Sequence, residues 1–253
     1  MAKDNRPTLA ALALAAALAF PAPAATAGGQ DLAACLKAAE TVPDTGLEKA
    51  RDWENRGGGD RAKLCHAMAL FHGGQFAPAG ERLEALVETL GRDDAQGAAT
   101  LLSRAGWAWL RAGQAARAER AYTQALARLP EDEDILIDRA IARAGQEKYW
   151  DAVADLTTVL NKAPQRAEAW LYRASAYRHL GNLELALGDV GRALALKPND
   201  PEALLLRGNL QAQDGDAMAA RADWRQVIKL APTAPEARSA EANLKRLDAA
   251  GKR

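Results

Sequence analysis

The 253-residue sequence contains few aromatic residues, few histidines and no excess of charge of either sign. Phe, Trp and Tyr make up 5% of it, 3 residues are histidine, and 33 Lys and Arg residues balance 33 Asp and Glu residues. This balance argues against a nucleic-acid partner held on a basic surface. The hydrophobic 49% is mostly Ala and Leu, which favour helices over strands, and the 26% of charged residues argues against disorder and against a multi-span membrane protein. The composition therefore predicts a folded, helical protein.

The one long apolar run occupies residues 9–20. Lys3 and Arg6 precede it, and Ala25–Ala27 follows it with the small residues that a signal peptidase requires. We therefore expect residues 1–27 to be a secretory signal peptide and the mature chain to be periplasmic, without a membrane span. An uncleaved anchor is the alternative, because the apolar stretch is just long enough to cross a bilayer.

The two cysteines, Cys35 and Cys65, both belong to the expected mature chain. Two thiols in an exported protein predict one disulfide. Two alternatives remain open at this point. The segment Leu32-Ala33-Ala34-Cys35 resembles a lipobox, in which the cysteine is acylated, although Gly28–Asp31 separates it from the apolar run. Free thiols are the other alternative.

The sequence repeats itself every 34 residues. Prolines recur at this spacing at Pro130, Pro164, Pro198 and Pro232, which defines the windows 99–132, 133–166, 167–200 and 201–234. In every window position 20 is alanine, position 8 is small, and position 24 is large and apolar. These residues are Ala118, Ala152, Ala186 and Ala220 at position 20, Gly106, Ala140, Ala174 and Gly208 at position 8, and Tyr122, Leu156, Val190 and Trp224 at position 24.

Each window has the pattern of a helix pair. Two apolar stripes with helical spacing flank a turn, and the proline at position 32 ends the second helix. The small side chains at positions 8 and 20 let the two helices approach closely, and the large one at position 24 fills the groove between neighbours. We therefore expect four consecutive helical hairpins.

The pattern resembles the tetratricopeptide repeat family in its period, its small residues at positions 8 and 20 and its proline at position 32. Window 167–200 matches best, with Trp170, Tyr177 and Gly181 at family positions. The resemblance implies an all-α fold, a right-handed superhelical solenoid of antiparallel helix pairs with a concave binding groove. Val159 and Val227 depart from the family's alanine at position 27, which predicts different local packing there.

The segments on either side of the repeats are expected to cap the solenoid. Residues 28–98 are predicted to form an N-terminal helical cap that includes a degenerate repeat beginning at Asp60. Residues 99–234 then form four repeats, and residues 235–253 form a C-terminal capping helix and tail. Terminal units of a solenoid cover the apolar face of their neighbour, and they usually depart from the repeat pattern.

Arginine at position 7 and aspartate at position 23 occur together in the last three windows. The pairs are Arg139 with Asp155, Arg173 with Asp189, and Arg207 with Asp223. The first window has alanine at both positions. Because Arg and carboxylate groups pair favourably between packed helices, we predict structural ion pairs at these sites.

In the family that the repeat resembles, first-helix positions 2, 5, 6, 9, 12 and 13 line the groove. The resemblance therefore implies a partner-binding groove made by Arg104, Trp107, Arg111, Asp134, Asp138, Glu168, Tyr172, Ser175, Arg178, His179, Asn209 and Gln213. This mixture of aromatic, aliphatic and charged groups suits an extended or helical peptide. The acids at position 2 have a second interpretation, because they also complement the positive ends of helices. The Lys and Asn pattern with which some family members hold a carboxylate is absent from the sequence.

No catalytic or phosphate-binding motif is found in the sequence. His66 and His72 do not share a helix face as zinc ligands do, and we interpret His66 as a surface imidazole beside a disulfide. We therefore expect no metal, no cofactor and no enzymatic activity. The predicted function is a scaffold or adaptor that binds a protein or peptide in the groove. The alternatives are a structural subunit of a cell-envelope complex that docks through the convex face or ends, and an enzyme accessory or an enzyme without a recognisable motif.

Overall fold

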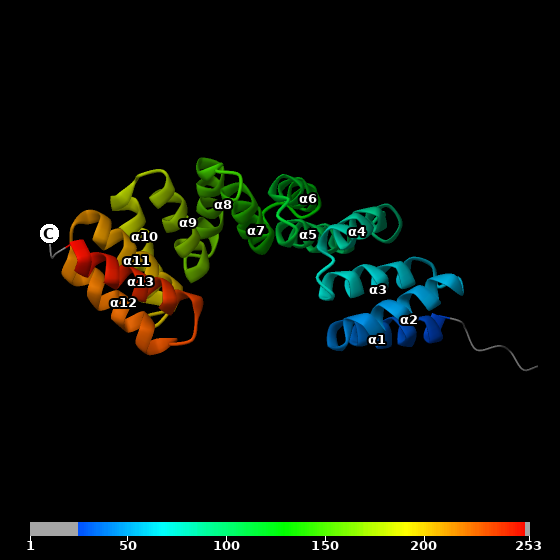
Figure 1. Ribbon diagram of the computed structural model, residues 1–253. Helices are drawn as coiled ribbons and strands as arrows, with labels where there is room; N and C mark the ends of the chain where they lie inside the picture. Colours follow the sequence, from blue (N-terminus) through cyan, green and yellow to red (C-terminus); the bar gives the residue numbers. More distant parts are fainter. Residues whose placement is uncertain (1–24, 251–253) are drawn as a thin grey trace, which may run out of the picture.

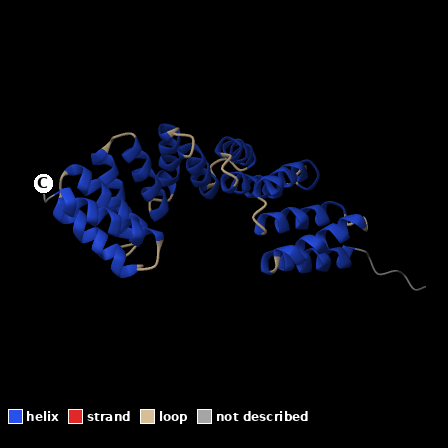
Figure 2. Cartoon of the chain, in the orientation of Figure 1, coloured by secondary structure: helices blue, strands red, loops and turns tan. Residues whose placement is uncertain are grey.

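The computed structural model describes residues 25–250, and every regular element within them is an α-helix (Figures 1 and 2). The helices are α1 (Ala25–Thr41), α2 (Pro43–Asn55), α3 (Gly59–His72), α4 (Phe76–Leu90), α5 (Ala95–Arg111), α6 (Ala115–Arg128), α7 (Glu133–Ala144), α8 (Tyr149–Lys162), α9 (Ala167–His179), α10 (Leu183–Leu196), α11 (Pro201–Asp214), α12 (Ala217–Leu230) and α13 (Pro235–Ala250). The predicted all-α fold is confirmed. Residues 1–24 of the expected signal peptide lie outside the described residues. Helix α1 begins at Ala25, within the expected cleavage motif.

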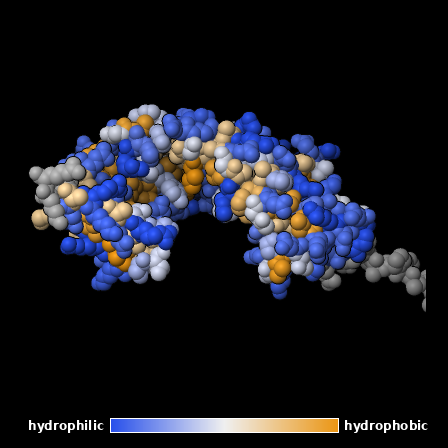
Figure 3. Space-filling view, in the orientation of Figure 1, coloured by the Kyte–Doolittle hydropathy of each residue, from blue (hydrophilic) through white to orange (hydrophobic). Residues whose placement is uncertain are grey.

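The helices form hairpins that stack into an arch (Figure 1). From α3 onward each helix packs mainly against the helices before and after it in the chain, whereas α1 packs against both α2 and α3. Helices α3, α5, α7 and α9 lie nearer the hollow of the arch than α4, α6, α8 and α10 do. The space-filling view shows the hollow, with apolar side chains along its border (Figure 3). The predicted solenoid is therefore confirmed. None of the helices between residues 25 and 250 combines the length and the apolar character that a membrane crossing requires.

Each 34-residue window contains one hairpin whose turn has a left-handed residue at position 15. This residue is Gly113 with φ 72°, Gly181 with φ 75° and Gly215 with φ 91° in three of the windows. Glycine adopts this conformation at little cost because it lacks a Cβ atom. The remaining window has Glu147 at the same position with φ 61°, so its turn keeps the shared geometry under backbone strain.

The residues at positions 8 and 24 are matched in volume within each repeat. A Cβ atom added to Gly106 would lie 2.7 Å from the ring of Tyr122, and one added to Gly208 would lie 2.7 Å from Nε1 of Trp224. Where position 8 is alanine, position 24 is Leu or Val. The missing methyl group on one helix therefore makes room for the aromatic ring on the other.

This matching predicts coupled effects of substitution. Gly106→Ala places a methyl group against the Tyr122 ring, and we expect it to lower the free energy of unfolding by about 1–3 kcal/mol. Tyr122→Leu alone leaves a cavity and costs about 2–4 kcal/mol. The double variant recreates the Ala140–Leu156 arrangement of the next repeat, so its loss is expected to be clearly smaller than the sum. Urea denaturation of the three variants measures this, and strictly additive losses would contradict the matching.

Most of the buried apolar side chains from α3 to α13 form two large clusters along the stack. The clusters extend from Ala67 to Ala169 and from Leu171 to Ala240, and the partly buried Trp170 packs against both. Each hairpin therefore covers the apolar face of its neighbours, as expected of a solenoid.

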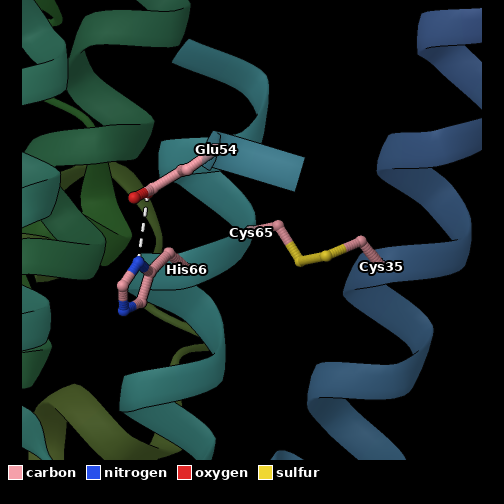
Figure 4. Close-up of a disulfide and its surroundings, with 4 residues drawn as sticks. All are labelled: Cys35, Glu54, Cys65 and His66. Carbon is pink, nitrogen blue, oxygen red and sulfur yellow. Dashed lines mark hydrogen bonds and ion pairs between the residues drawn. A yellow bond between two sulfur atoms is a disulfide. The ribbon is translucent and has the colours of Figure 1, made fainter. Parts of the chain in front are cut away.

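The predicted disulfide is confirmed and joins α1 to α3 (Figure 4). The Cα atoms of Cys35 and Cys65 lie 6.0 Å apart, and both side chains are buried. The small cluster around them also includes the buried Ala50 of α2. The bond thus fixes the first helix to the degenerate repeat, and a bridged Cys35 has no thiol left to acylate.

The prediction that His66 lies on the surface is wrong. His66 is 5% exposed, and its Nδ1 lies 3.1 Å from Oε1 of Glu54 (Figure 4). The same oxygen accepts a hydrogen bond from Arg82 at 3.2 Å. Burial lowers the pKa of His66, and the charge of Arg82 lowers it further. His66 and Arg82 occupy positions 7 and 23 of the degenerate repeat, so a carboxylate from α2 supplies what aspartate supplies in the later repeats.

Candidate functional site

Two adjoining cavities open among the helices that lie nearer the hollow of the arch. The central cavity has a volume of about 460 Å³ and lies among α3, α5 and α7. The N-terminal cavity has a volume of about 650 Å³ and lies mainly among α1, α3 and α5. The residues that line both are Met68, His72, Gln96, Thr100 and Arg104. The two cavities therefore form one continuous depression, which we call the trough.

An aromatic cluster borders the central cavity. Trp107 is 45% exposed, and its ring centre lies 5.3 Å from that of Phe71. The guanidinium of Arg111 lies 4.7 Å from the centre of the Phe76 ring and 5.7 Å from that of Trp107. These cation–π contacts hold Arg111 beside the cavity and leave the ring of Trp107 accessible.

The opposite wall of the central cavity is acidic and is supplied by α7. Asp132 caps this helix, because its Oδ1 accepts a hydrogen bond from the Ile135 amide at 3.1 Å. Asp138 is half-buried one helical turn beyond Asp134, and among the described residues it has neither a hydrogen bond nor an ion pair. Burial, and then the charges of Asp134 and Asp132, raise the pKa of the Asp138 carboxyl to about 6. A carboxylate in this position favours a cation beside it.

Two buried hydroxyl groups near this wall also have no hydrogen-bond partner. The Oγ of Ser103 lies in the lining of the central cavity, and the hydroxyl of Tyr122 is fully buried against α5. Burial raises the pKa of Tyr122, and the charge of Asp138 raises it further, which indicates that the two groups are neighbours. Buried polar groups are normally paired, so the Ser103 hydroxyl in the cavity lining is available to a bound group, whereas Tyr122 does not line the cavity.

The raised pKa of Asp138 predicts a pH-dependent stability. The ordinary pKa is 3.8 and the folded value is about 6, so folding favours the protonated form. The contribution of this carboxyl to stability is full below pH 4 and is lost as the pH rises through 6. We therefore expect Asp138→Asn to be more stable than the wild type by about 1–2 kcal/mol at pH 7, with the difference disappearing below pH 4. The charged or titratable groups around the carboxyl are Arg104 and His72 across the cavity, Tyr122 on α6, Asp132 at the N-cap of α7, Asp134 on α7, and Tyr172 on α9.

Thermal unfolding of the two proteins between pH 4 and pH 8 measures this difference. Asp151→Asn, which changes an exposed acid on α8, is the matched control and should show no such trend. A wild type that is more stable than the Asp138 variant at pH 7 would contradict the prediction.

Arg166 forms ion pairs with two of the acids that were predicted to line the groove, Asp134 and Glu168. Its guanidinium lies 2.6 Å from Asp134 and 2.6 Å from Glu168, and it thereby joins the starts of α7 and α9. Burial raises the pKa of Glu168, but hydrogen bonds from its own backbone and from Arg166 outweigh this and lower it. Asp134 lines the central cavity, whereas Glu168 serves the contact between the two helix starts.

Three predicted residues line a separate C-terminal cavity of about 330 Å³, namely Tyr172, Ser175 and His179. The His179 ring stacks on Tyr149, with ring centres 4.6 Å apart and an angle of 6°. Burial and the charge of Arg178 lower the pKa of His179, and Nη2 of Arg178 lies 3.0 Å from its Nε2. These residues are brought together, but in a cavity apart from the trough.

The structure does not bring Asn209 and Gln213 to the trough. The side chain of Asn209 accepts hydrogen bonds from Trp224 at 3.1 Å and from Asn243 at 2.6 Å, so it helps to hold α13 in place. Gln213 is exposed near the end of α11 and lines none of the three cavities described above.

Several residues of the trough were missed by the sequence analysis, although a signal for them existed. Leu64, Met68, Phe71 and His72 line one or both cavities from α3. Counted from Asp60, they occupy positions 5, 9, 12 and 13, which are the groove positions used for the later repeats. Applying the same register to the degenerate repeat identifies all four.

The arginines and aspartates of the last three windows are paired in the structure. Each arginine donates two hydrogen bonds to the aspartate of its own repeat, with distances between 2.7 and 3.0 Å for Arg139–Asp155, Arg173–Asp189 and Arg207–Asp223. Asp155 also accepts a hydrogen bond from Arg143 at 2.7 Å. Arg173 in addition donates to Thr157 of the preceding repeat at 3.0 Å. The pairs therefore lie between the two helices of a hairpin.

Comparison with known proteins finds both a matching sequence family and similar structures. Sequence models of the tetratricopeptide repeat match residues 137–203 and 202–234. No curated protein is a significant match to the sequence.

PilW, a widely conserved type IV pilus biogenesis factor, has a similar structure with a TM-score of 0.68 and 18% identity, over 84% of this chain and 97% of PilW. MamA from Desulfovibrio magneticus RS-1 has a TM-score of 0.60 and 18% identity, over 70% of this chain and 97% of the MamA chain. A thermophilic tetratricopeptide-repeat protein of Thermus thermophilus, TTC0263, has a TM-score of 0.58 and 19% identity, over 73% of this chain and 97% of that one.

The fold and the concave cavities thus define a helical-repeat solenoid. Residues 137–234 of the chain are tetratricopeptide repeats, since two models of this family match them. The similarity to the solved structures, all below 20% identity, shows a shared fold. Within residues 25–250, no group of three or more His, Cys, Asp or Glu side chains is arranged to hold a metal ion.

Proposed function

We propose that this protein is a non-catalytic scaffold that binds a segment of a protein partner in the trough. The observation that carries this proposal is the continuity of the central and N-terminal cavities across α1, α3, α5 and α7. Their volumes of about 460 and 650 Å³ are those of sites that hold several side chains. Because the helices already form the walls, the scaffold orders little when the partner binds.

The chemistry of the walls supports a peptide ligand. Trp107 and Phe71 offer apolar surface, Arg104 faces the trough from α5, and Asp138 faces it from α7. A protein segment supplies apolar and charged side chains at short intervals, and recognition of a peptide in a groove depends on such alternation.

The proposal is tested by partner capture from native cell extract with purified variants. The variant Trp107→Ala removes ring surface from the central cavity, and we expect it to lose most of the captured partner. Trp150→Ala is the control, since Trp150 is 61% exposed on α8 and lines none of the three cavities. Full capture by the Trp107 variant would contradict binding in the trough.

Docking through another face is the second candidate function. Trp150, Leu185 and Met218 are 61%, 50% and 83% exposed, and they lie in the first turns of α8, α10 and α12. An apolar row of this kind is the feature that an envelope complex would cover. Loss of capture by the Trp150 variant alone would favour this alternative.

We also propose that the mature chain is periplasmic and begins at Gly28. The expected signal peptide and the buried disulfide support export to an oxidising compartment. Intact mass spectrometry of the protein purified from its native cells is expected to show a chain from Gly28 to Arg253, about 2 Da lighter than its reduced form. A mass raised by lipid, or one that includes the leader, would contradict this proposal.

A further inference from the structure

We propose that the central cavity binds a lysine or arginine side chain of the partner segment, with the cation at Asp138 and the aliphatic stem against Trp107. This inference rests on the proposed function, since it specifies the chemistry of the segment that occupies the trough.

The first observation is that Asp138 has no partner, unlike the buried acids of this chain. Asp155, Asp189 and Asp223 are buried, and each accepts two hydrogen bonds from an arginine of its own repeat. Asp138 is half-buried, and no such partner is found among the described residues. A carboxylate that is partly removed from water and left unpaired weakens the fold, so a bound cation would complete the site.

The second observation is the charge around the carboxylate. Two other acids, Asp132 and Asp134, line the same wall of the cavity as Asp138. Arg166 pairs with Asp134, whereas Asp132 caps α7 and has no ion pair among the described residues. Asp132 and Asp138 therefore give this wall a negative charge, which favours a cation and disfavours the carboxylate of a peptide.

The third observation is a hydrogen-bond acceptor in the lining of the same cavity. The Oγ of Ser103 lies there without a hydrogen-bond partner. An ammonium or guanidinium group has several donors, and this oxygen supplies an acceptor in addition to the carboxylate. A divalent metal ion would require more carboxylate ligands than Asp138 alone provides.

The fourth observation fixes the direction of the bound side chain. Trp107 is 45% exposed and lines the cavity, so the exposed part of its ring can pack against an aliphatic stem. Arg104 faces the same cavity from α5, where the sulfur of Met68 accepts a long hydrogen bond from it at 3.7 Å. Its charge repels a basic side chain from that end and directs the cation to the α7 wall.

The test uses a bead library of acetylated and amidated octapeptides in which each position is Lys, Arg, Glu, Gln, Leu or Ala. The fluorescently labelled chain from Gly28 to Arg253 is incubated with the library, and bound peptides are sequenced and resynthesised. We expect at least one Lys or Arg to be enriched at a fixed distance from an apolar residue. Replacing that basic residue with Gln should weaken binding about tenfold or more in fluorescence anisotropy.

Variants of the protein identify the group that holds the cation. Asp138→Asn keeps the shape of the side chain and should weaken the selected peptides about tenfold or more, and Ser103→Ala should weaken them to a smaller extent. Asp151→Asn removes the same charge from an exposed position on α8 and should have no effect. Circular dichroism and thermal unfolding verify that every variant is folded.

The outcomes separate this inference from the proposed function. Peptides that bind the wild type and bind Trp107→Ala more weakly support binding in the trough. If no basic residue is enriched in them, or if Asp138→Asn binds them equally well, the inference about the cation is wrong and the proposed function is retained. If the selected peptides bind the Trp107 variant and the Asp138 variant as tightly as the wild type, they bind elsewhere and both proposals are wrong. Selection of acidic peptides that need Arg104 would likewise overturn the inference.

Discussion

Replacing Asp155 with alanine is expected to lower the free energy of unfolding by about 3–5 kcal/mol. Asp155 is 5% exposed and accepts two hydrogen bonds from Arg139, at 3.0 and 2.7 Å, and one from Arg143 at 2.7 Å. Its removal leaves two largely buried guanidinium groups without this carboxylate, and an unpaired buried charge is costly. Denaturation in urea, followed by circular dichroism, measures the loss.

The control for this prediction lies on the same helix. Asp151→Ala removes an exposed carboxylate of α8 and is expected to change the stability by less than about 0.5 kcal/mol. A loss of under about 1 kcal/mol in the Asp155 variant would show that water replaces the carboxylate, and that the pairs do not hold the hairpins together.

Opening the Cys35–Cys65 disulfide is expected to destabilise the N-terminal unit by about 3–4 kcal/mol, because the bond closes a loop with a sequence separation of 30. Helix α1 is the terminal helix of the stack and is covered by neighbours on one side, so its loss of protection should exceed that of the central repeats. Hydrogen exchange of the double variant Cys35→Ser, Cys65→Ser measures the effect helix by helix. We expect faster exchange in α1 and α2 and unchanged exchange in α11 and α12.

The disulfide also has a consequence for binding. Leu36 and Glu40 of α1 line the N-terminal cavity, so detachment of this helix removes one of its walls. Peptides that span both cavities should bind the double variant more weakly, whereas short peptides confined to the central cavity should not. Equal exchange of α1 in both proteins would show that apolar packing alone holds it, and would contradict this prediction.

The fold was predictable from the sequence because every repeat has the same types of residue at the positions where its two helices pack. The 34-residue spacing, the small residue at position 8 and the alanine at position 20 specify a hairpin four times over. The coupling of Gly106 with Tyr122 and of Gly208 with Trp224 is already visible in the sequence, since each aromatic residue at position 24 accompanies glycine at position 8.

The site was less predictable, because the contacts of the residues at groove positions depend on neighbours that differ from one repeat to the next. Asp134 and Asp138 both occupy such positions, yet Arg166 from the next repeat pairs with the first and leaves the second alone. Asn209 holds α13, which no repeat pattern specifies. His66 is buried because Glu54, from a helix outside the repeat, lies against it. Contacts between units of different sequence do not follow from the repeat pattern, and only the structure shows them.

These features give the solenoid an uneven inner surface. The trough at α1, α3, α5 and α7 combines aromatic surface with an unpaired acid, whereas Asn209 near the other end helps to hold α13. The N-terminal half of the concave face therefore carries the trough on which the proposed function depends.

Site-specific photocrosslinking tests the central claim, binding in the trough, most directly. The photoreactive residue p-benzoylphenylalanine replaces either Trp107, beside the central cavity, or Trp150, in the exposed row on α8, in cells that produce the full chain. We expect irradiation to join a partner to the protein at position 107 and not at position 150. A partner joined at position 150 alone would contradict the proposed groove and would establish docking through the exposed row.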